Sequence, residues 1–359
     1  MRKTFIWVFT VFLAGMIVVN PAQSLEAGRS ALVLCANVLI PSLLPFFICA
    51  NILIYSGGAA FFGRFLSFFM KPLFNVNGAG ALALATGMIS GYPSGAAVTC
   101  RLYDAGAVTR DEAHRLLAFT NNSGPLFIMG AVGVGIYGSP RLGVILYVSH
   151  VLAALLTGVV FRFFGAGGKA LPSAPSTAND AQNLLGNAIS DSVKSIINLC
   201  GYVVFFAVLT AVLEKSGIIG LLTTMFVGTK ADTSLLLTKG LFEMATSISA
   251  VRSTNFAAVS CVLAVGGLSV LFQTQSFTSK SGLSIKTYIF GKLLCGGFSA
   301  LITRLILAFN PVEIEVFAAA VTSLKIKMFL YYLLGAFGMG ISIFALFSFI
   351  SLIFLGRKR

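Results

Sequence analysis

Long apolar segments alternate with short polar connections along almost the whole chain. A helix needs about 20 consecutive, mainly apolar residues to cross the hydrocarbon layer of a membrane. About eight segments approach that length, at residues 4–20, 31–56, 116–138, 141–164, 196–214, 253–277, 287–309 and 328–355. The pattern therefore predicts an all-α integral membrane protein with about eight crossings.

Two further segments, residues 79–98 and 235–251, are apolar but interrupted. The first contains four helix-disfavouring residues, Gly87, Gly91, Pro93 and Gly95. Backbone that is not helical is tolerated at membrane depth only where it is buried in protein or faces a cavity. Both segments are therefore predicted to be re-entrant hairpins.

The composition supports the membrane interpretation. Hydrophobic side chains make up 57% of the 359 residues and charged ones only 10%, so a water-soluble core could not hide the apolar surface. A net charge of +14 would suggest nucleic acid binding in a soluble protein. Here the basic residues flank apolar segments, which favours positive-inside topology and contact with lipid headgroups, and no nucleic acid partner is expected. An anionic solute is the alternative reason for the positive charge.

Neither catalysis nor metal binding is indicated. Six cysteines occur singly, without a CxxC spacing or a histidine partner, as expected of small buried thiols rather than disulfides or metal ligands. The chain contains no nucleophile elbow, P-loop, HExxH motif or paired catalytic carboxylates. We therefore expect no enzyme, cofactor or metal, with a membrane enzyme of dispersed active-site residues as the alternative.

Two parts of the chain repeat each other at a spacing of 142 residues, the distance from Gly124 to Gly266. Residues 124–128 match 266–270, and residues 150–162 match 292–304. The second match places His150 opposite Lys292, at a corresponding depth, which also raises a proton-relay role. Two similar halves, each with an interrupted helix, are typical of secondary transporters that bind their solute between the halves.

The basic residues also predict how the halves are oriented. More Lys and Arg residues fall on the inner side when both termini are placed in the cytoplasm, and corresponding segments then run in opposite directions, so the repeats are inverted. The predicted parts are an N-terminal transmembrane helix (1–27), a first repeat (28–164), a flexible cytoplasmic linker (165–183), a second inverted repeat (184–309), and an external loop with a C-terminal transmembrane helix (310–359). Residues 1–24 could instead be a cleaved signal peptide, although an uncleaved helix is favoured.

The candidate solute-binding residues are the polar side chains in the hairpins and next to the helix breaks. They are Ser90, Tyr92, Ser94, Asn121, Asn122, Ser123, Glu243, Ser247, Arg252, Ser269 and Gln273. A buried polar group costs about 1–3 kcal/mol if it has no partner, so each must pair with protein, water or solute. Tyr92 offers a flat ring and a hydroxyl, and the N-termini of broken helices attract anions. Arg252 could bind a carboxylate through two parallel hydrogen bonds.

Structural roles are the alternative for several of these residues. The polar residues at 90–95 could merely shape a hairpin tip, and the two asparagines could hydrogen-bond between helices. Glu243 could form an ion pair with Arg252 or Lys239. A different polar segment is assigned a structural role outright: Thr109 followed by Glu112 has the capping-box spacing and predicts a helix start.

The motifs resemble those of YlbJ-type sporulation integral membrane proteins, which belong to the nucleoside-recognition (Gate domain) group. The resemblance covers residues 30–310 and rests on 89–96, 112–128, 130–133, 137–140, 266–270 and Gln273. It implies a fold similar to that of concentrative nucleoside transporters, with two inverted repeats that each carry a re-entrant hairpin and a broken helix. It also implies a role in endospore formation, moving dipicolinic acid across the outer forespore membrane, and it favours a homo-oligomer.

We therefore expect an inverted-repeat transporter of a small polar aromatic anion, located in the cell membrane or the outer forespore membrane, with lipid and a small-molecule solute as its partners. A nucleoside transporter coupled to Na⁺ or H⁺ is the first alternative. A non-transporting membrane scaffold in sporulation is the second.

Overall fold

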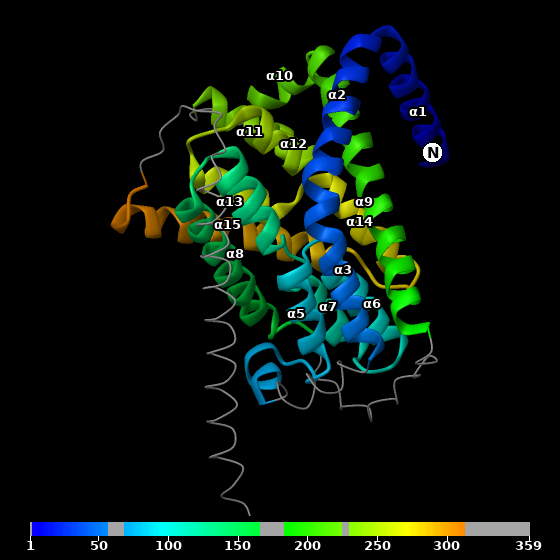
Figure 1. Cartoon of the computed structure of the whole chain (residues 1–359), viewed down its shortest axis with the longest axis vertical. Helices are drawn as coiled ribbons and strands as arrows, with labels where there is room; N and C mark the ends of the chain where they lie inside the picture. The colour runs from blue at the N-terminus through cyan, green and yellow to red at the C-terminus, as the bar shows by residue number, and fades with distance from the viewer. Residues whose placement is uncertain (1, 57–67, 166–182, 225–229, 313–359) are drawn as a thin grey trace, which may run out of the picture.

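The computed structural model describes residues 2–56, 68–165, 183–224 and 230–312 (Figure 1). The predicted C-terminal helix at 328–355 and nearly all of the linker at 165–183 lie outside this part. Within it, every regular element is helical. The helices of the first half are α1 (Arg2–Val19), α2 (Pro21–Leu34), η1 (Cys35–Leu39), α3 (Ile40–Tyr55), α5 (Gly80–Ser90), α6 (Ser94–Asp104), α7 (Arg110–Phe119), η2 (Leu126–Ile136) and α8 (Pro140–Phe161).

The second half repeats this arrangement of elements. Its helices are α9 (Leu184–Lys215), α10 (Ile218–Thr223), α11 (Ala231–Phe242), α12 (Met244–Val251), α13 (Phe256–Val265), α14 (Gly267–Thr278) and α15 (Lys286–Phe309). In each half a long helix is followed by a pair of short helices, then by a helix interrupted near its middle, and then by another long helix. The interruptions contain Gly124 and Gly266, the residues related by the 142-residue spacing.

Four helical segments among the described residues are long and apolar enough to cross a membrane. They are Pro140–Phe161, Leu184–Lys215, Phe256–Thr278 and Lys286–Phe309. They correspond to four of the predicted crossings, although α9 begins at Leu184 rather than at residue 196. The segment predicted at 31–56 is part of a longer helical run that starts at Pro21 and contains the π-helical turn η1. The total number of crossings stays a prediction.

The predicted capping box is confirmed at the start of α7. The Thr109 hydroxyl accepts from the Glu112 backbone N–H at 3.3 Å, and the Glu112 carboxylate accepts from the Thr109 backbone N–H at 2.8 Å. Glu112 also accepts from the backbone N–H of Asn77 at 2.8 Å, which ties α7 to the segment before α5. The box therefore fixes the helix that leads into the first break.

The first hairpin, α5 and α6 joined by residues 91–93, corrects one detail of the sequence interpretation. Gly87 and Gly95 do not break helices, because Gly87 lies inside α5 and Gly95 inside α6. Their role is close packing: a Cβ atom added at either position would lie 1.6 or 2.1 Å, respectively, from the carbonyl oxygen of Thr120. Only Gly91 and Pro93 lie at the interruption. That these hairpins are re-entrant stays a prediction.

Pairs of helices from opposite halves form the contact between the halves. Helices α2 and α3 pack along α9, and α15 packs against α8 and α7 (Figure 1). The contact of α15 with α7 is close, since a Cβ atom added at Gly291 would lie 2.3 Å from the Ala118 carbonyl oxygen. The long helix α15 of the second half therefore packs directly against α7, the helix that leads into the first break.

Replacing Gly95 with alanine should loosen the first hairpin, because the added methyl group collides with the Thr120 backbone, which cannot easily move. We expect a loss of about 1–3 kcal/mol, typical of overpacking, measured as a lower melting temperature of the purified protein in detergent. Gly201→Ala is the matched control, since nothing lies within 4 Å of a Cβ atom added there in α9. Equal melting temperatures for the two variants would contradict the packing role.

Candidate solute-binding site

The tip of the first hairpin contacts the break of each half. A Cβ atom added at Gly91 would lie 2.8 Å from the Gly124 backbone nitrogen, in the first break. A Cβ atom added at Gly266, in the second break, would lie 3.3 Å from Cζ of Tyr92. Two adjacent residues of one hairpin, Gly91 and Tyr92, therefore contact the interrupted backbones of both halves. The sequence predicts the solute-binding site at this meeting of the two halves.

A small cavity of about 40 Å³ lies at this junction. Five of the predicted residues line it: Tyr92, Ser123, Glu243, Ser269 and Gln273. The other lining residues are Gly91 and Gly124 together with Leu39, Phe127, Leu199, Val203, Met244, Ala245 and Val270. Since a single water needs about 10–15 Å³ of such volume, the cavity has room for a few waters. A larger solute could enter only if the surrounding elements moved apart.

Tyr92 lines the cavity and is also hydrogen-bonded to the second half. The side chain is 5% exposed, and its hydroxyl donates to the carbonyl oxygens of Ala264 at 2.9 Å and Leu263 at 3.2 Å. These carbonyls belong to the last turn of α13, where helix geometry leaves acceptors unused. Tyr92 therefore also fastens the hairpin tip to the end of the helix before the second break.

Asn121 and Asn122 are fully buried, and both hydrogen-bond within the protein. The Asn121 amide donates to the Thr274 hydroxyl of α14 at 2.9 Å and links the two halves. The Asn122 amide donates to the Phe119 carbonyl oxygen at 2.7 Å, and its own oxygen accepts from Lys292 Nζ at 3.2 Å. Neither asparagine lines the cavity, so a direct contact with solute stays a prediction.

Glu243 forms neither of the ion pairs considered from the sequence. Its buried carboxylate caps the N-terminus of α12, accepting from the backbone N–H groups of Ala245 at 3.0 Å and Thr246 at 2.6 Å and from the Thr246 hydroxyl at 2.6 Å. Lys239 pairs instead with Glu214 at 2.8 Å. The negative charge is thus stabilised by a helix N-terminus.

The structure places Arg252 and Ser247 outside the cavity lining. Arg252 is exposed at the end of α12 in the left-handed conformation, with φ 48°. The Ser247 hydroxyl donates to the Glu243 backbone carbonyl. Ser247 lies within α12 and Arg252 directly follows it, while the Glu243 carboxylate caps the other end of this helix. A solute in the cavity would contact Ser247 or Arg252 only after a rearrangement.

Gln273 and Ser90 have polar atoms available for a ligand. The Gln273 amide donates to Ser269 Oγ at 3.3 Å, while its Oε1 atom is buried and has no hydrogen-bond partner among the described residues. The Ser90 hydroxyl is likewise buried and unpaired in that part of the chain. Gln273 also lines the cavity.

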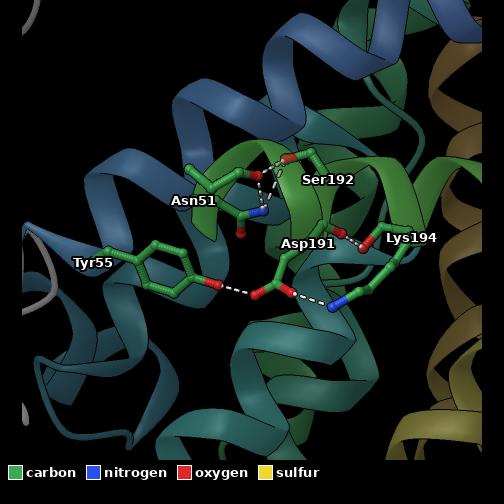
Figure 2. Close-up of polar contacts among 7 residues, drawn as sticks. Asn51, Tyr55, Asp191, Ser192 and Lys194 are labelled. Carbon is green, nitrogen blue, oxygen red and sulfur yellow. Dashed lines mark hydrogen bonds and ion pairs between the residues drawn. The ribbon is translucent and has the colours of Figure 1, made fainter. Parts of the chain in front are cut away.

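A second cavity of about 40 Å³ is lined by residues of the same hairpin and of α3, among them Ser94, Arg101 and Asn51. Figure 2 shows the polar contacts beside it, between α3 and α9. Asn51 donates to Ser192 at 2.9 Å, and the Tyr55 hydroxyl donates to the Asp191 carboxylate, which also pairs with Lys194 at 3.5 Å (Figure 2). Corresponding helices of the two halves are therefore joined by polar contacts at one end.

Sequence reasoning did not include Lys292 and His150 among the candidate site residues. Lys292 is 2% exposed, and its Nζ atom lies 3.4 Å from the Tyr92 hydroxyl and 5.1 Å from the centre of the Tyr92 ring. His150 Nε2 accepts from the Ser123 backbone N–H at 3.1 Å. The 142-residue repeat, which pairs these two residues inside apolar helices, was the available signal.

Comparisons with known proteins agree with this geometry. A family model described as Gate, nucleoside recognition, matches residues 36–167. The chain is also 33% identical over 332 residues to the sporulation integral membrane protein YlbJ of Bacillus subtilis (strain 168), a match that covers 83% of this chain and 81% of that protein. The chain belongs to the YlbJ family of sporulation integral membrane proteins.

The fold of this YlbJ-family chain is similar to that of a transporter. A solved structure of a variant of CNTnw, a concentrative nucleoside transporter, in the intermediate 3 state aligns with a TM-score of 0.54 and 13% sequence identity. The alignment covers 87% of this chain and 86% of that one. The resemblance inferred from the motifs is confirmed for the family and for the transporter-like helical fold.

Replacing Glu243 with alanine should destabilise α12, because the helix loses its cap and the backbone N–H groups of Ala245 and Thr246, one buried and one half-buried, lose their acceptor. We expect a cost of about 1–2 kcal/mol, read as a lower melting temperature in detergent. Glu26→Ala, which removes an exposed carboxylate from α2, is the control. If both variants melt together with the unmodified protein, the carboxylate does not support the helix.

Proposed function

We propose that this protein moves a small polar aromatic anion, dipicolinic acid, across the outer forespore membrane by alternating access. The family assignment supports a role in sporulation, and the transporter-like fold supports movement of a small molecule. The observation that carries the proposal is the contact of one hairpin tip with the breaks of both halves, beside a cavity lined by polar groups from each half.

The lining suits a planar dicarboxylate. Tyr92 offers a flat aromatic face, and Ser123, Ser269 and Gln273 offer polar atoms at its edges. Helix α14 begins at Gly267, directly after the second break, so the uncommitted N–H groups of its first turn favour an anion. The N-terminus of α12 is already occupied by the Glu243 carboxylate. We therefore expect the solute carboxylates to approach the start of α14.

Entry of the solute requires the hairpin tip to separate from the breaks. The contacts that would open are those between Gly91 and Gly124 and between Tyr92 and Gly266. The contact between Gly91 and Gly124 has no side chains to interlock, so it can separate and re-form readily. Separation of Tyr92 from Gly266 also breaks the hydrogen bonds from the Tyr92 hydroxyl to Leu263 and Ala264. This is physically consistent with alternate opening of the site to the two sides of the membrane.

A nucleoside, carried together with Na⁺ or H⁺, is the second candidate solute. The description of the matched family model and the similarity to a concentrative nucleoside transporter favour it. A nucleoside also presents a flat ring and several hydrogen-bonding groups, so the cavity lining suits both solutes. We expect both termini to lie in the cytoplasm and the protein to contact lipid and form a homo-oligomer.

Purified protein in liposomes distinguishes these candidates. We expect time-dependent accumulation of dipicolinate and little accumulation of uridine, compared with liposomes that lack the protein. Accumulation of uridine alone would favour the nucleoside candidate. Flux of neither, across a broader panel of nucleosides and aromatic carboxylates, would favour a non-transporting scaffold.

Gln273→Leu tests the cavity without disturbing the fold. The change removes a buried acceptor that has no partner among the described residues, together with one long hydrogen bond to Ser269 at 3.3 Å, so stability should change by less than about 1 kcal/mol. If the amide binds solute, uptake at low solute concentration should fall at least about tenfold. Gln275→Leu is the matched control, since it lies on the same helix but not in the cavity lining. Equal uptake by the two variants would exclude Gln273 as a ligand.

A further inference from the structure

The side chain of Lys292 is a buried basic group that has no anionic partner among the described residues. No described carboxylate lies within 4 Å of its Nζ atom, and the side chain is 2% exposed. Its hydrogen-bond partners are the neutral Asn122 amide oxygen at 3.2 Å and the Tyr92 hydroxyl at 3.4 Å. A buried ammonium without a counter-ion is costly, because neutral dipoles replace only part of its hydration.

The titratable side chains around Lys292 include no carboxylate that could act as its counter-ion. Tyr92 faces it from the hairpin tip and Tyr288 from its own helix, with the ring centres at 5.1 and 6.0 Å from Nζ. His150 of α8 and Cys295 of α15 lie close enough to interact electrostatically, and Cys261 of α13 lies next to Cys295. The carboxylate of Glu243 already receives three hydrogen bonds at α12. None of these groups supplies the missing negative charge.

The position of Lys292 connects its charge to the cavity. Its two hydrogen-bond partners are Tyr92, which lines the cavity, and Asn122, which lies in the first break. A solute anion placed in the cavity against Tyr92 would therefore be separated from the Lys292 amine by the Tyr92 side chain. The attraction between an anion there and a protonated Lys292 would be strong, since the side chains of Tyr92 and Lys292 are both buried and charges interact strongly away from bulk water.

We propose that Lys292 binds the proton that is carried together with the solute anion, so that this protein is a proton–solute symporter. The inference rests on the proposed transport of an anion. On entry of the solute, the Nζ lone pair takes a proton from bulk water, and on the other side of the membrane Nζ returns it as the anion leaves. The anion stabilises the ammonium, and by linkage the proton raises the affinity for the anion to the same degree.

The same linkage gives the direction of the pH effect. At pH values near and above neutrality, where carboxylates stay ionised, lowering the pH should tighten binding of dipicolinate. Binding should take up a proton, to a maximum of about one per solute molecule. Lys292→Arg keeps a charge at all these pH values, so it should bind the anion without proton uptake. Lys292→Met, which removes the charge, should weaken binding at least about tenfold and also abolish proton uptake.

Calorimetric titration of the full-length protein in detergent with dipicolinate, repeated in two buffers of different ionisation enthalpy, measures proton uptake directly. Lys286→Met, at the exposed start of the same helix, is the matched control and should behave like the unmodified protein. Lys292→Met replaces a buried basic group with an apolar side chain of similar length and should stay folded. A melting curve checks the fold of every variant. If Lys292→Arg lowers the melting temperature, its larger side chain has disturbed the fold, and the comparison of Lys292→Met with Lys286→Met then decides whether Lys292 takes up the proton.

Proton uptake by the unmodified protein and by Lys286→Met, absent in the Lys292 variants, is the expected result. Binding of dipicolinate with no proton uptake, or with uptake that is unchanged in Lys292→Met, would overturn the proton-carrying role and leave the proposed function in place. If the unmodified protein binds neither dipicolinate nor any other aromatic carboxylate, both proposals fail.

Discussion

The contact of Gly91 and Tyr92 with the two helix breaks is the constraint on which the rest of the structure depends. Interrupted backbone inside a membrane protein must be covered by protein or by ligand. Here each break is covered by the same hairpin tip, so neither half can complete its interior alone. The cavity, its polar lining and the buried lysine all lie at or directly behind this junction.

Small residues make this junction close enough to form. Gly87 and Gly95 allow α5 and α6 to approach the Thr120 carbonyl, and Gly291 allows α15 to approach Ala118. Polar side chains then bridge what the glycines bring together, as in the hydrogen bond from Asn121 to Thr274 and that from Tyr92 to Ala264. Packing and hydrogen bonding of this kind hold helices together where lipid weakens the hydrophobic effect.

Features encoded within one element were predictable from the sequence. The capping box at Thr109, the long apolar helices and the breaks at Gly124 and Gly266 follow from residue spacing, and the structure contains each of them. Partners on different elements were not predictable, because spacing along the chain does not give distances between helices. The sequence for this reason did not reveal that Glu243 caps α12 instead of pairing with Lys239. It also did not reveal that Arg252 is exposed and outside the cavity lining. The position of Lys292 behind Tyr92 has the same explanation, although the repeat indicated its depth.

A structure of the protein determined with dipicolinate bound tests the central claim most directly. We predict that the solute lies against the Tyr92 ring, with its carboxylates near Gln273 and the start of α14, and that the hairpin tip is displaced from Gly124 and Gly266. Solute bound elsewhere, for example in the groove between α13 and α15 beside Arg304, with the tip still in contact with both breaks, would contradict it.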